Sequence, residues 1–370
     1  MAAPDAPREV SAARIVSQGL AAPLPDPVAA VEALLAIQGQ QPSAIPWAIG
    51  VRAEGAARSD IEEAFERVEL VRSWPMRGTV HVTSARDHHW LRACLAHRYS
   101  AWLAQTSRNG LAQSVVDRAG QLAVQEIARS GPRTRAQLVE VWQDAGIVVG
   151  GPGAVGNDAP GSPVNRRHLM VRLHIDGVLA QGPVRGNEHL VVDASSLPAA
   201  GDVAKGGAAH AEALALLAER YARGHGPVSA QDLARWASLP VSEARRALAA
   251  AVEASRGGAV PIVERSRGFE REDLPDLVAG LRRRADGVFA LPSFDELHVG
   301  YRDRSCLTDE AGERAICPSR NGMFRPIVVR RGRVVAVRLP SGGLEFLDGA
   351  SGTARSQARA AVERRMRWLA

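Results

Sequence analysis

An internal repeat constrains the fold of this 370-residue chain more than any other feature of its sequence. Gly131-Pro132 and Gly226-Pro227 each follow an Ala/Leu-rich segment, and each is followed at similar spacing by a hydroxyl residue, a leucine and a tryptophan. A Gly-Pro pair ends a helix, and a hydroxyl residue just after it can cap the next helix. Two such copies, about 95 residues apart, indicate a tandem array of one structural unit.

Both copies predict the same order of elements, namely three helices followed by extended sequence. The capping hydroxyl is Thr134 in the first copy and Ser229 in the second. The predicted helices cover 114–129, 134–144 and 163–176 in the first copy, and 208–223, 229–237 and 241–254 in the second. Extended sequence follows at 178–183 with 188–193, and at 259–264. This order is that of the winged helix-turn-helix, which binds double-stranded DNA. A generic helical repeat without DNA binding is the alternative.

The N-terminal third is predicted to form a further unit of the same kind. Its predicted elements are helices at 8–20, 27–37, 42–53 and 59–67, strands at 69–74 and 77–83 around a Pro75-Met76 turn, and a helix at 85–96. The C-terminal part differs, with a strand at 288–292, a helix near 294–299, a β-hairpin of 325–330 and 333–338, and a closing helix at 353–369. The predicted fold is mainly α with small β-wings (α+β): three tandem winged-helix units at 1–110, 111–205 and 206–290, and a C-terminal β-hairpin region at 291–370.

Composition narrows the partners and the compartment of such a fold. The 46 Lys and Arg residues against 40 Asp and Glu residues give a net charge of +6, a modest excess that permits a polyanionic partner. Three cysteines without paired spacing argue against a disulfide framework and a zinc site. We see no signal peptide and no apolar run long enough for a membrane helix. We therefore expect a soluble, cytoplasmic, bacterial-type protein, and a monomer, because tandem units reduce the need to dimerise.

Three parts of the sequence resemble one known family. The segment Met76-Arg77-Gly78-Thr79-Val80-His81-Val82 is similar to its wing strand, and Leu291–Asp295 with Gly300–Ser305 is similar to its LPxFDExLLGYRDRS segment. Arg325–Val329 followed by Gly332–Val335 fits its C-terminal hairpin. The family is the AlkZ-like alkylpurine DNA glycosylases. The resemblance extends over nearly the whole chain and implies three winged-helix units that act on alkylated DNA.

The family's catalytic signature is Gln-x-Gln at the end of an early helix, and the resemblance implies this role for Gln38 and Gln40. The middle residue is apolar in the family, whereas Gly39 leaves the local backbone less constrained. The residue types suit the chemistry, because an N7- or N3-alkylated purine is cationic and already a good leaving group. Such a substrate does not require a titratable general base. Two amide side chains, which do not titrate, therefore suffice if they orient one attacking water. A solvent-exposed helix end without catalytic function is the alternative.

The single lysine of the chain, Lys205, bears on the type of glycosylase. Glycosylases that also cut the DNA strand commonly form a Schiff base through an amine. Lys205 lies in a Gly/Ala-rich linker without an obvious pocket, so we expect a monofunctional enzyme that uses water and no cofactor. The N-terminal amine is the alternative nucleophile.

Several further residues are candidates for DNA contacts. Arg77, Thr79 and His81 alternate along a predicted wing strand and share one face. Arginines at the start of a recognition helix or at a hairpin commonly contact phosphates, and the remaining candidates are Arg166, Arg167, Arg302, Arg304, Arg330, Arg331 and Arg333. Ordinary solvated or ion-paired side chains are the alternative for each. His88 and His89 lack a third ligand, so we predict no metal site.

The sequence therefore predicts hydrolysis of cationic alkylpurines in double-stranded DNA. The resemblance is to the branch of the family that carries Gln-x-Gln. It also implies unhooking of interstrand crosslinks and self-protection in a producer of a DNA-alkylating natural product. Two alternatives come from other classes of protein. One is a winged-helix transcription regulator without catalytic activity, and the other is a chromatin-associated binder without lesion preference.

Overall fold

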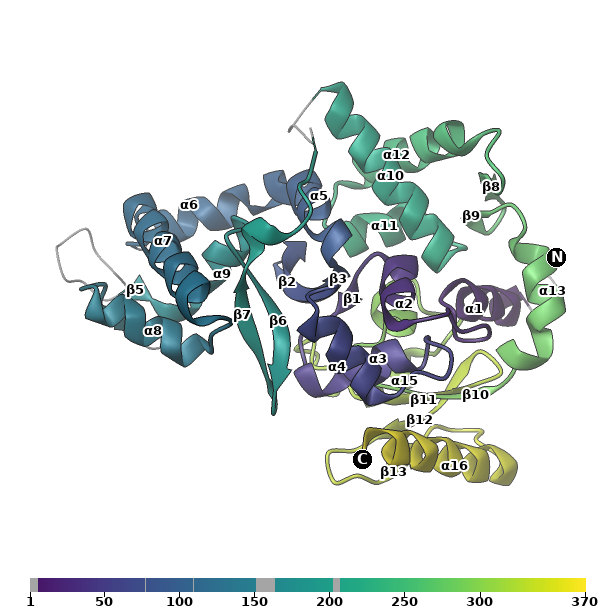
Figure 1. Cartoon of the computed structure of the whole chain (residues 1–370). Coiled ribbons are helices and arrows are strands. Elements are labelled where there is room, and N and C mark those ends of the chain that lie inside the picture. Colours follow the sequence, from purple (N-terminus) through teal and green to yellow (C-terminus); the bar gives the residue numbers. More distant parts are fainter. Residues whose placement is uncertain (1–5, 77, 109, 151–163, 202–206) are drawn as a thin grey trace. The chain divides into compact units, whose positions relative to one another are not determined.

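The residues that the computed structural model describes (Figure 1) are 6–76, 78–108, 110–150, 164–201 and 207–370. Contacts within the chain divide it into two compact units. Unit 1 consists of Met1–Ile61 and Ala211–Ala370, and unit 2 consists of Glu62–His210. The chain passes from one unit to the other within α4 (Arg58–Glu66) and α10 (Ala208–His225). This grouping follows contacts rather than repeats, and the four-part division of the sequence stays a prediction.

Unit 2 contains a four-stranded antiparallel arrangement in the order β3, β2, β6, β7. Its strands are β2 (Leu70–Met76), β3 (Thr79–Ser84), β4 (Val149–Gly150), β5 (Val164–Asn165), β6 (Leu179–Arg185) and β7 (Glu188–Asp193). Its helices are α5 (Ala85–Leu95), α6 (Ser100–Arg108), α7 (Gln113–Ser130), α8 (Arg135–Asp144) and α9 (Arg166–Ile175). Leu138 and Trp142 of α8 are fully buried, and the Trp142 indole donates to the carbonyl of Ala119 over 2.9 Å. The tryptophan of the first repeat is therefore a core residue.

Unit 1 combines helices with a second antiparallel sheet. Its helices, apart from α10, are α1 (Ala6–Ser17), α2 (Pro27–Leu34), α3 (Ile45–Gly50), α11 (Ala230–Ala237), α12 (Val241–Ser255), α13 (Leu274–Ala285), α14 (Glu296–Val299), α15 (Glu310–Ile316) and α16 (Gly352–Leu369). Its strands are β1 (Ile37–Gln38), β8 (Ile262–Arg265), β9 (Gly268–Arg271), β10 (Val288–Leu291), β11 (Ile327–Arg330), β12 (Arg333–Arg338) and β13 (Leu344–Phe346).

The sheet of unit 1 runs β10-β11-β12-β13 and is covered on both faces. Val328 and Ala336 pack against Ala358 of α16, the closing helix that lies along the sheet in Figure 1. Ile327 and Val329, which alternate with Val328 along β11, join the core cluster that also contains residues of α1 and α13. Alternate residues of a strand point to opposite faces, so this short sheet contributes to two apolar layers.

The capping residues of the two repeats occupy equivalent places. Thr134 caps α8 and Ser229 caps α11, and each forms a reciprocal capping box with the residue three positions later, Gln137 or Asp232. The helices after the two Gly-Pro pairs therefore begin where the sequence predicts.

The pairing of strands also repeats between the copies. Arg133, which follows the first Gly-Pro, pairs antiparallel with Val191 of β7, and Val228, which follows the second, pairs antiparallel with Phe269 of β9. In each copy the residue after the proline thus joins the second strand of the following hairpin. The repeat is real in three dimensions, while its assignment as a winged helix stays a prediction.

Some local predictions were wrong. Pro75 and Met76 belong to β2 and do not form the turn, which comes after them at Gly78. The predicted helix at 42–53 is a 3-10 turn at Pro42–Ala44 followed by the short α3. The helices α13 and α15 and the strand β13 were not predicted. Among the described residues, no helix is both long and apolar enough to cross a membrane.

Candidate active site

The Gln-x-Gln motif lies between α2 and α3 of unit 1. The helix α2 ends at Leu34, so Gln38 belongs to the two-residue strand β1 and does not lie at a helix end as predicted. Gln38 is half-buried, Gly39 is buried and Gln40 is exposed. The motif therefore presents one partly enclosed amide and one amide that solvent reaches.

A buried carboxylate holds the backbone of this motif. The N–H of Gln38 donates to Oε1 of Glu296 over 3.2 Å. The indole of Trp236 donates to Oε2 of Glu296, also over 3.2 Å, and Nε2 of His225 lies 3.5 Å from that oxygen. Burial lowers the pKa of His225, although the hydrogen bond to Glu296 opposes this effect. The imidazole is therefore neutral at neutral pH.

The neighbouring carboxylate holds the chain beyond the motif. Arg52 donates to both oxygens of Asp295, over 2.8 and 2.9 Å, and both side chains are almost completely buried. Arg52 also donates to the side chain of Gln18 over 2.9 Å. A buried bidentate pair of this kind is geometrically demanding. Residues 38 and 52 are thus each tied to one of two consecutive acidic residues.

A second buried network surrounds the GYRDRS segment. The guanidinium of Arg14 lies 3.7 Å from the centre of the Tyr301 ring, donates to the carbonyl of Asp303 over 2.8 Å and lies 3.6 Å from Asp232. Asp232 in turn accepts the N–H of Arg302 over 2.7 Å. The segment that most resembles the family is therefore anchored in unit 1 by the buried Tyr301 and by its backbone, although Arg302 and Asp303 are exposed.

Sequence reasoning did not single out the residues that hold these networks together, namely Arg14, His225, Asp232 and Glu296. Their signal is a charged or titratable residue at an apolar helix position, such as Arg14 between Ala13 and Ile15. Their partners are far away in sequence, and no local pattern identifies them.

The predicted wing residues lie in a less open environment than expected. His81 is fully buried in β3 and its Nδ1 lies 3.0 Å from the carbonyl of Thr79, which is half-buried. Arg77 lies outside the described residues. A contact of these residues with DNA stays a prediction.

Arg166 and Arg167 are both exposed in the first turn of α9. Asn165 caps this helix, and its side chain accepts the N–H of Arg167 over 3.0 Å. The two arginines therefore extend from an ordered helix start, a favourable place for phosphate oxygens.

The arginines of the GYRDRS segment have different surroundings. Arg302 is exposed. Arg304 is half-buried and donates to Glu313 over 3.1 Å. Arg302 is therefore accessible to a ligand, while Arg304 has a structural partner.

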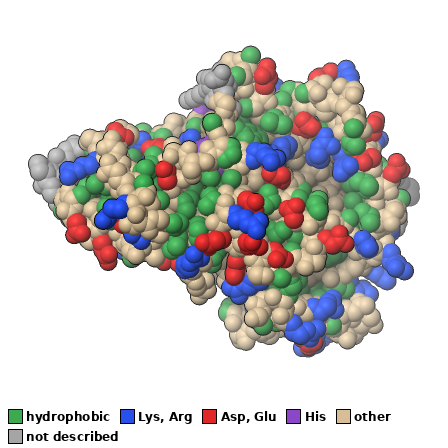
Figure 2. Space-filling model, in the orientation of Figure 1, with side chains coloured by type: hydrophobic (Ala, Val, Ile, Leu, Met, Phe, Trp, Pro, Cys, Tyr) green, Lys and Arg blue, Asp and Glu red, His purple; other side chains and the backbone are tan. Residues whose placement is uncertain are grey.

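The hairpin of β11 and β12 carries the remaining candidates. Arg330 donates to the side chain of Gln357 over 2.7 Å, and Arg333 donates to the carbonyl of Ser305 over 2.8 Å. Arg331 is exposed in the turn and has a φ of +49°. On the face shown in Figure 2, arginine side chains are intermingled with acidic ones. Which of these residues contact DNA stays a prediction.

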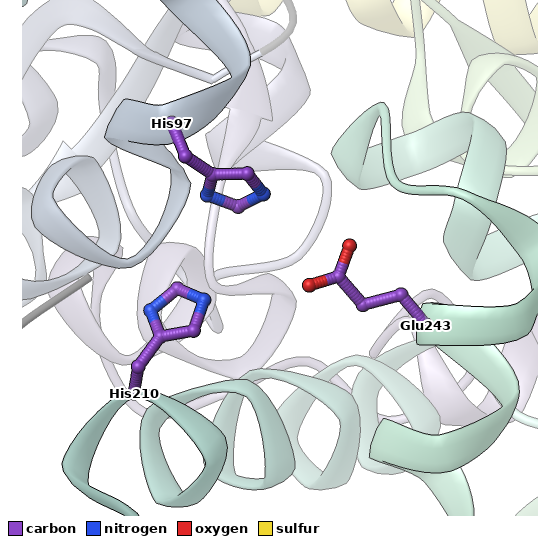
Figure 3. Close-up of side chains that lie close together, drawn as sticks. All are labelled: His97, His210 and Glu243. Carbon is purple, nitrogen blue, oxygen red and sulfur yellow. The ribbon is translucent and has the colours of Figure 1, made fainter. Parts of the chain in front are cut away.

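Figure 3 shows a pair of histidines in unit 2. The ring centres of His97 and His210 lie 5.3 Å apart, nearly perpendicular to one another. Glu243, drawn in the same view, belongs to unit 1. Two imidazoles alone are too few ligands for a structural metal site, so we assign none to this pair.

Comparisons with known proteins identify the family. The family described as "DNA glycosylase AlkZ-like" matches residues 31–343. A search of curated proteins finds no match. Among solved structures, the DNA glycosylase AlkZ of Streptomyces sahachiroi is similar, with a TM-score of 0.71 and 19% identity over 98% of this chain and 96% of that one. The chain therefore belongs to the AlkZ-like DNA glycosylase family, and it is a DNA glycosylase.

Proposed function

We propose that this glycosylase hydrolyses the N-glycosidic bond of cationic N7- and N3-alkylated purines in double-stranded DNA. The observation that carries the proposal is the Gln38-Gly39-Gln40 segment. It follows the buried end of a helix, and the backbone N–H of Gln38 donates to the buried carboxylate of Glu296. An amide offers an acceptor oxygen and a donor nitrogen, so two amides can fix the place of one water. Neither amide titrates, which matches a substrate whose leaving group is already activated.

The proposed reaction forms one bond and breaks one bond at C1′ of the sugar. The water oxygen attacks C1′ while the bond from C1′ to N9 breaks, and the electron pair of that bond neutralises the cationic purine. The proton of the attacking water passes to solvent. Positioning supplies most of the rate enhancement that this reaction needs. A neutral purine is a poorer leaving group, and the enzyme should discriminate against it.

We further propose that the same reaction unhooks interstrand crosslinks between alkylated purines, and that it protects a producer of a DNA-alkylating compound. The exposure of Gln40 supports this extension, because a site open to solvent leaves room for an adduct that continues beyond the purine.

The test is release of free base from defined duplexes. We expect the protein to release N7-methylguanine from a duplex that contains it, to leave unmodified and 8-oxoguanine duplexes intact, and to convert a crosslinked duplex into separable strands. Equal binding of all duplexes without base release would overturn the proposal and favour a non-catalytic DNA-binding protein. Release of methylated base without crosslink unhooking would overturn only the extension.

A further inference from the structure

We propose that Glu296 is a positioning residue for base excision, and that its buried carboxylate sets the place of Gln38 by accepting the backbone N–H of that residue. The inference rests on the proposed function and assigns a role to a side chain outside the Gln-x-Gln motif. Glu296 is 1% exposed, so it acts through Gln38 and not on the substrate.

A residue with a strained backbone precedes each of the two partners of this hydrogen bond. Leu35 lies three residues before Gln38 and has a φ of +65°, and Phe294 lies two residues before Glu296 and has a φ of +61°. Both side chains are buried, and bulky non-glycine residues rarely adopt this conformation. Strain of this kind persists where the surroundings impose it, and it is concentrated at functional sites.

The acidic pair Asp295-Glu296 fixes the segment at two points. Glu296 binds the backbone at Gln38, whereas Asp295 binds the side chain of Arg52 at the other end of the segment. Asp295 also caps α14 by accepting the N–H of Leu297 over 3.0 Å. The two carboxylates at the start of α14 therefore hold the chain through its backbone at residue 38 and through a side chain at residue 52.

The carboxylate is better explained by this role than by core stability. Arg52 pairs with Asp295, and burial lowers the pKa of His225, whose Nε2 lies 3.5 Å from Oε2 of Glu296. Burying a carboxylate costs free energy, and apolar residues fill a core more cheaply. The N–H groups of Gln38 and Trp236 converge on its two oxygens instead. Oε1 thus holds the backbone of Gln38, while the Trp236 indole fixes the orientation of the carboxylate through Oε2.

The central test is single-turnover release of N7-methylguanine by Glu296→Gln, measured beside duplex affinity and thermal unfolding. The amide that replaces the carboxylate has one oxygen, so it cannot accept from both Gln38 and Trp236. We expect the excision rate to fall about 10- to 100-fold, because small misplacements of a reacting group cost about this much. Duplex affinity should stay within about twofold, since Glu296 does not reach the DNA.

A rescue experiment separates positioning from general stability. Trp236→Phe removes the indole N–H, which frees the single amide oxygen introduced by Glu296→Gln to accept from Gln38. We expect Trp236→Phe alone to lower the rate a few-fold, and we expect its addition to Glu296→Gln to raise the rate of that variant. A merely structural role predicts that two core substitutions lower the rate further than one.

The matched control is Glu270→Gln, which neutralises another buried carboxylate of unit 1. Glu270 is 6% exposed and pairs with Arg265 over 3.1 Å. We expect this variant to excise at the wild-type rate.

A folded Glu296→Gln variant with the wild-type excision rate would overturn the inference. An equal fall of the excision rate in Glu270→Gln would also overturn it. If Glu296→Gln does not fold, Trp236→Phe becomes the deciding variant. A wild-type excision rate in Trp236→Phe would overturn the inference. A few-fold lower excision rate at unchanged duplex affinity would support it. Failure of the wild-type protein to release base would instead overturn the proposed function.

Discussion

At the scale of single residues, the proposed mechanism has the side chains of Gln38 and Gln40 hold the same water. We expect Gln38→Ala and Gln40→Ala each to lower single-turnover excision of N7-methylguanine about 30- to 1,000-fold, the cost of a lost contact in a preorganised site. Duplex affinity should change little, because phosphate contacts dominate binding. The double variant should lose less than the product of the two single losses, since both amides act on one water.

Gln41 provides the internal control for this pair. It is exposed, and its amide donates to the hydroxyl of Ser43 over 3.2 Å. Gln41→Ala should therefore excise at the wild-type rate. Near wild-type rates for both Gln38→Ala and Gln40→Ala would place the active site elsewhere in the protein.

Lys205 is the only lysine-derived amine available for a Schiff base, although it lies outside the described residues. We expect borohydride to trap no covalent protein–DNA adduct, and strands to break only after alkali or heat, because water is the nucleophile. Efficient trapping would contradict a monofunctional mechanism, and its loss in Lys205→Ala would identify the amine responsible.

Two buried histidines should make unit 2 sensitive to acid. Burial, with Arg72 nearby, lowers the pKa of His174 and of His189 to about 4 from an ordinary value of 6.5. Below pH 6.5 the unfolded chain takes up protons at these residues, whereas the folded unit does not until about pH 4. The free energy of unfolding should therefore fall as the pH drops through this window, by up to about 3 kcal/mol per histidine, and stay constant above it.

Thermal unfolding at about pH 7.5, 6.5 and 5.5 measures this effect, because these values lie above, at and below the ordinary pKa of histidine. The melting temperature should be nearly the same at the first two values and lower at the third. In His189→Gln, which cannot titrate, the difference between the second and third values should shrink. Equal melting temperatures at all three values would show that the folded protein accommodates these protons.

At the scale of elements, the capping boxes of the repeat should contribute measurable stability. We expect Thr134→Ala to lower the free energy of unfolding by about 1 kcal/mol, because the N–H of Gln137 in the first turn of α8 loses its side-chain acceptor. Denaturant unfolding measures the change. Ser114→Ala is the control, because Ser114 is exposed within α7 and is not its cap. Equal effects of the two substitutions would remove capping as the explanation.

The elements that were predicted well share a local signal. Helices α7, α8, α10, α11 and α12 begin and end close to the predicted residues, because Gly-Pro pairs, caps and apolar periodicity are all local. The end of α2 and the start of α3 were misplaced. Leu34 and Leu35 are both apolar and buried, yet the helix ends between them, where Leu35 has a φ of +65° and the backbone leaves the helical path.

At the scale of the whole molecule, DNA binding should depend strongly on salt. The arginines at Arg166, Arg167, Arg302 and Arg331 are exposed and available to phosphates. If about five to eight phosphates are contacted, the logarithm of the binding constant should fall with the logarithm of salt at a slope of roughly −5 to −7. Fluorescence anisotropy with an unmodified duplex between about 50 and 200 mM salt measures this slope. A slope near zero would exclude electrostatic DNA binding by this protein.

The sequence by itself determined the α+β class, the repeat around Gly131 and Gly226, and the family, because these depend on local patterns and on short motifs. Only the tertiary structure decided what surrounds the motif. It brought Glu296 to Gln38 and Asp295 to Arg52, pairs that lie 258 and 243 residues apart in the chain, and it placed His81 in a core. Burial and long-range hydrogen bonds arise from packing between distant segments, and a single sequence does not encode those distances in any local pattern.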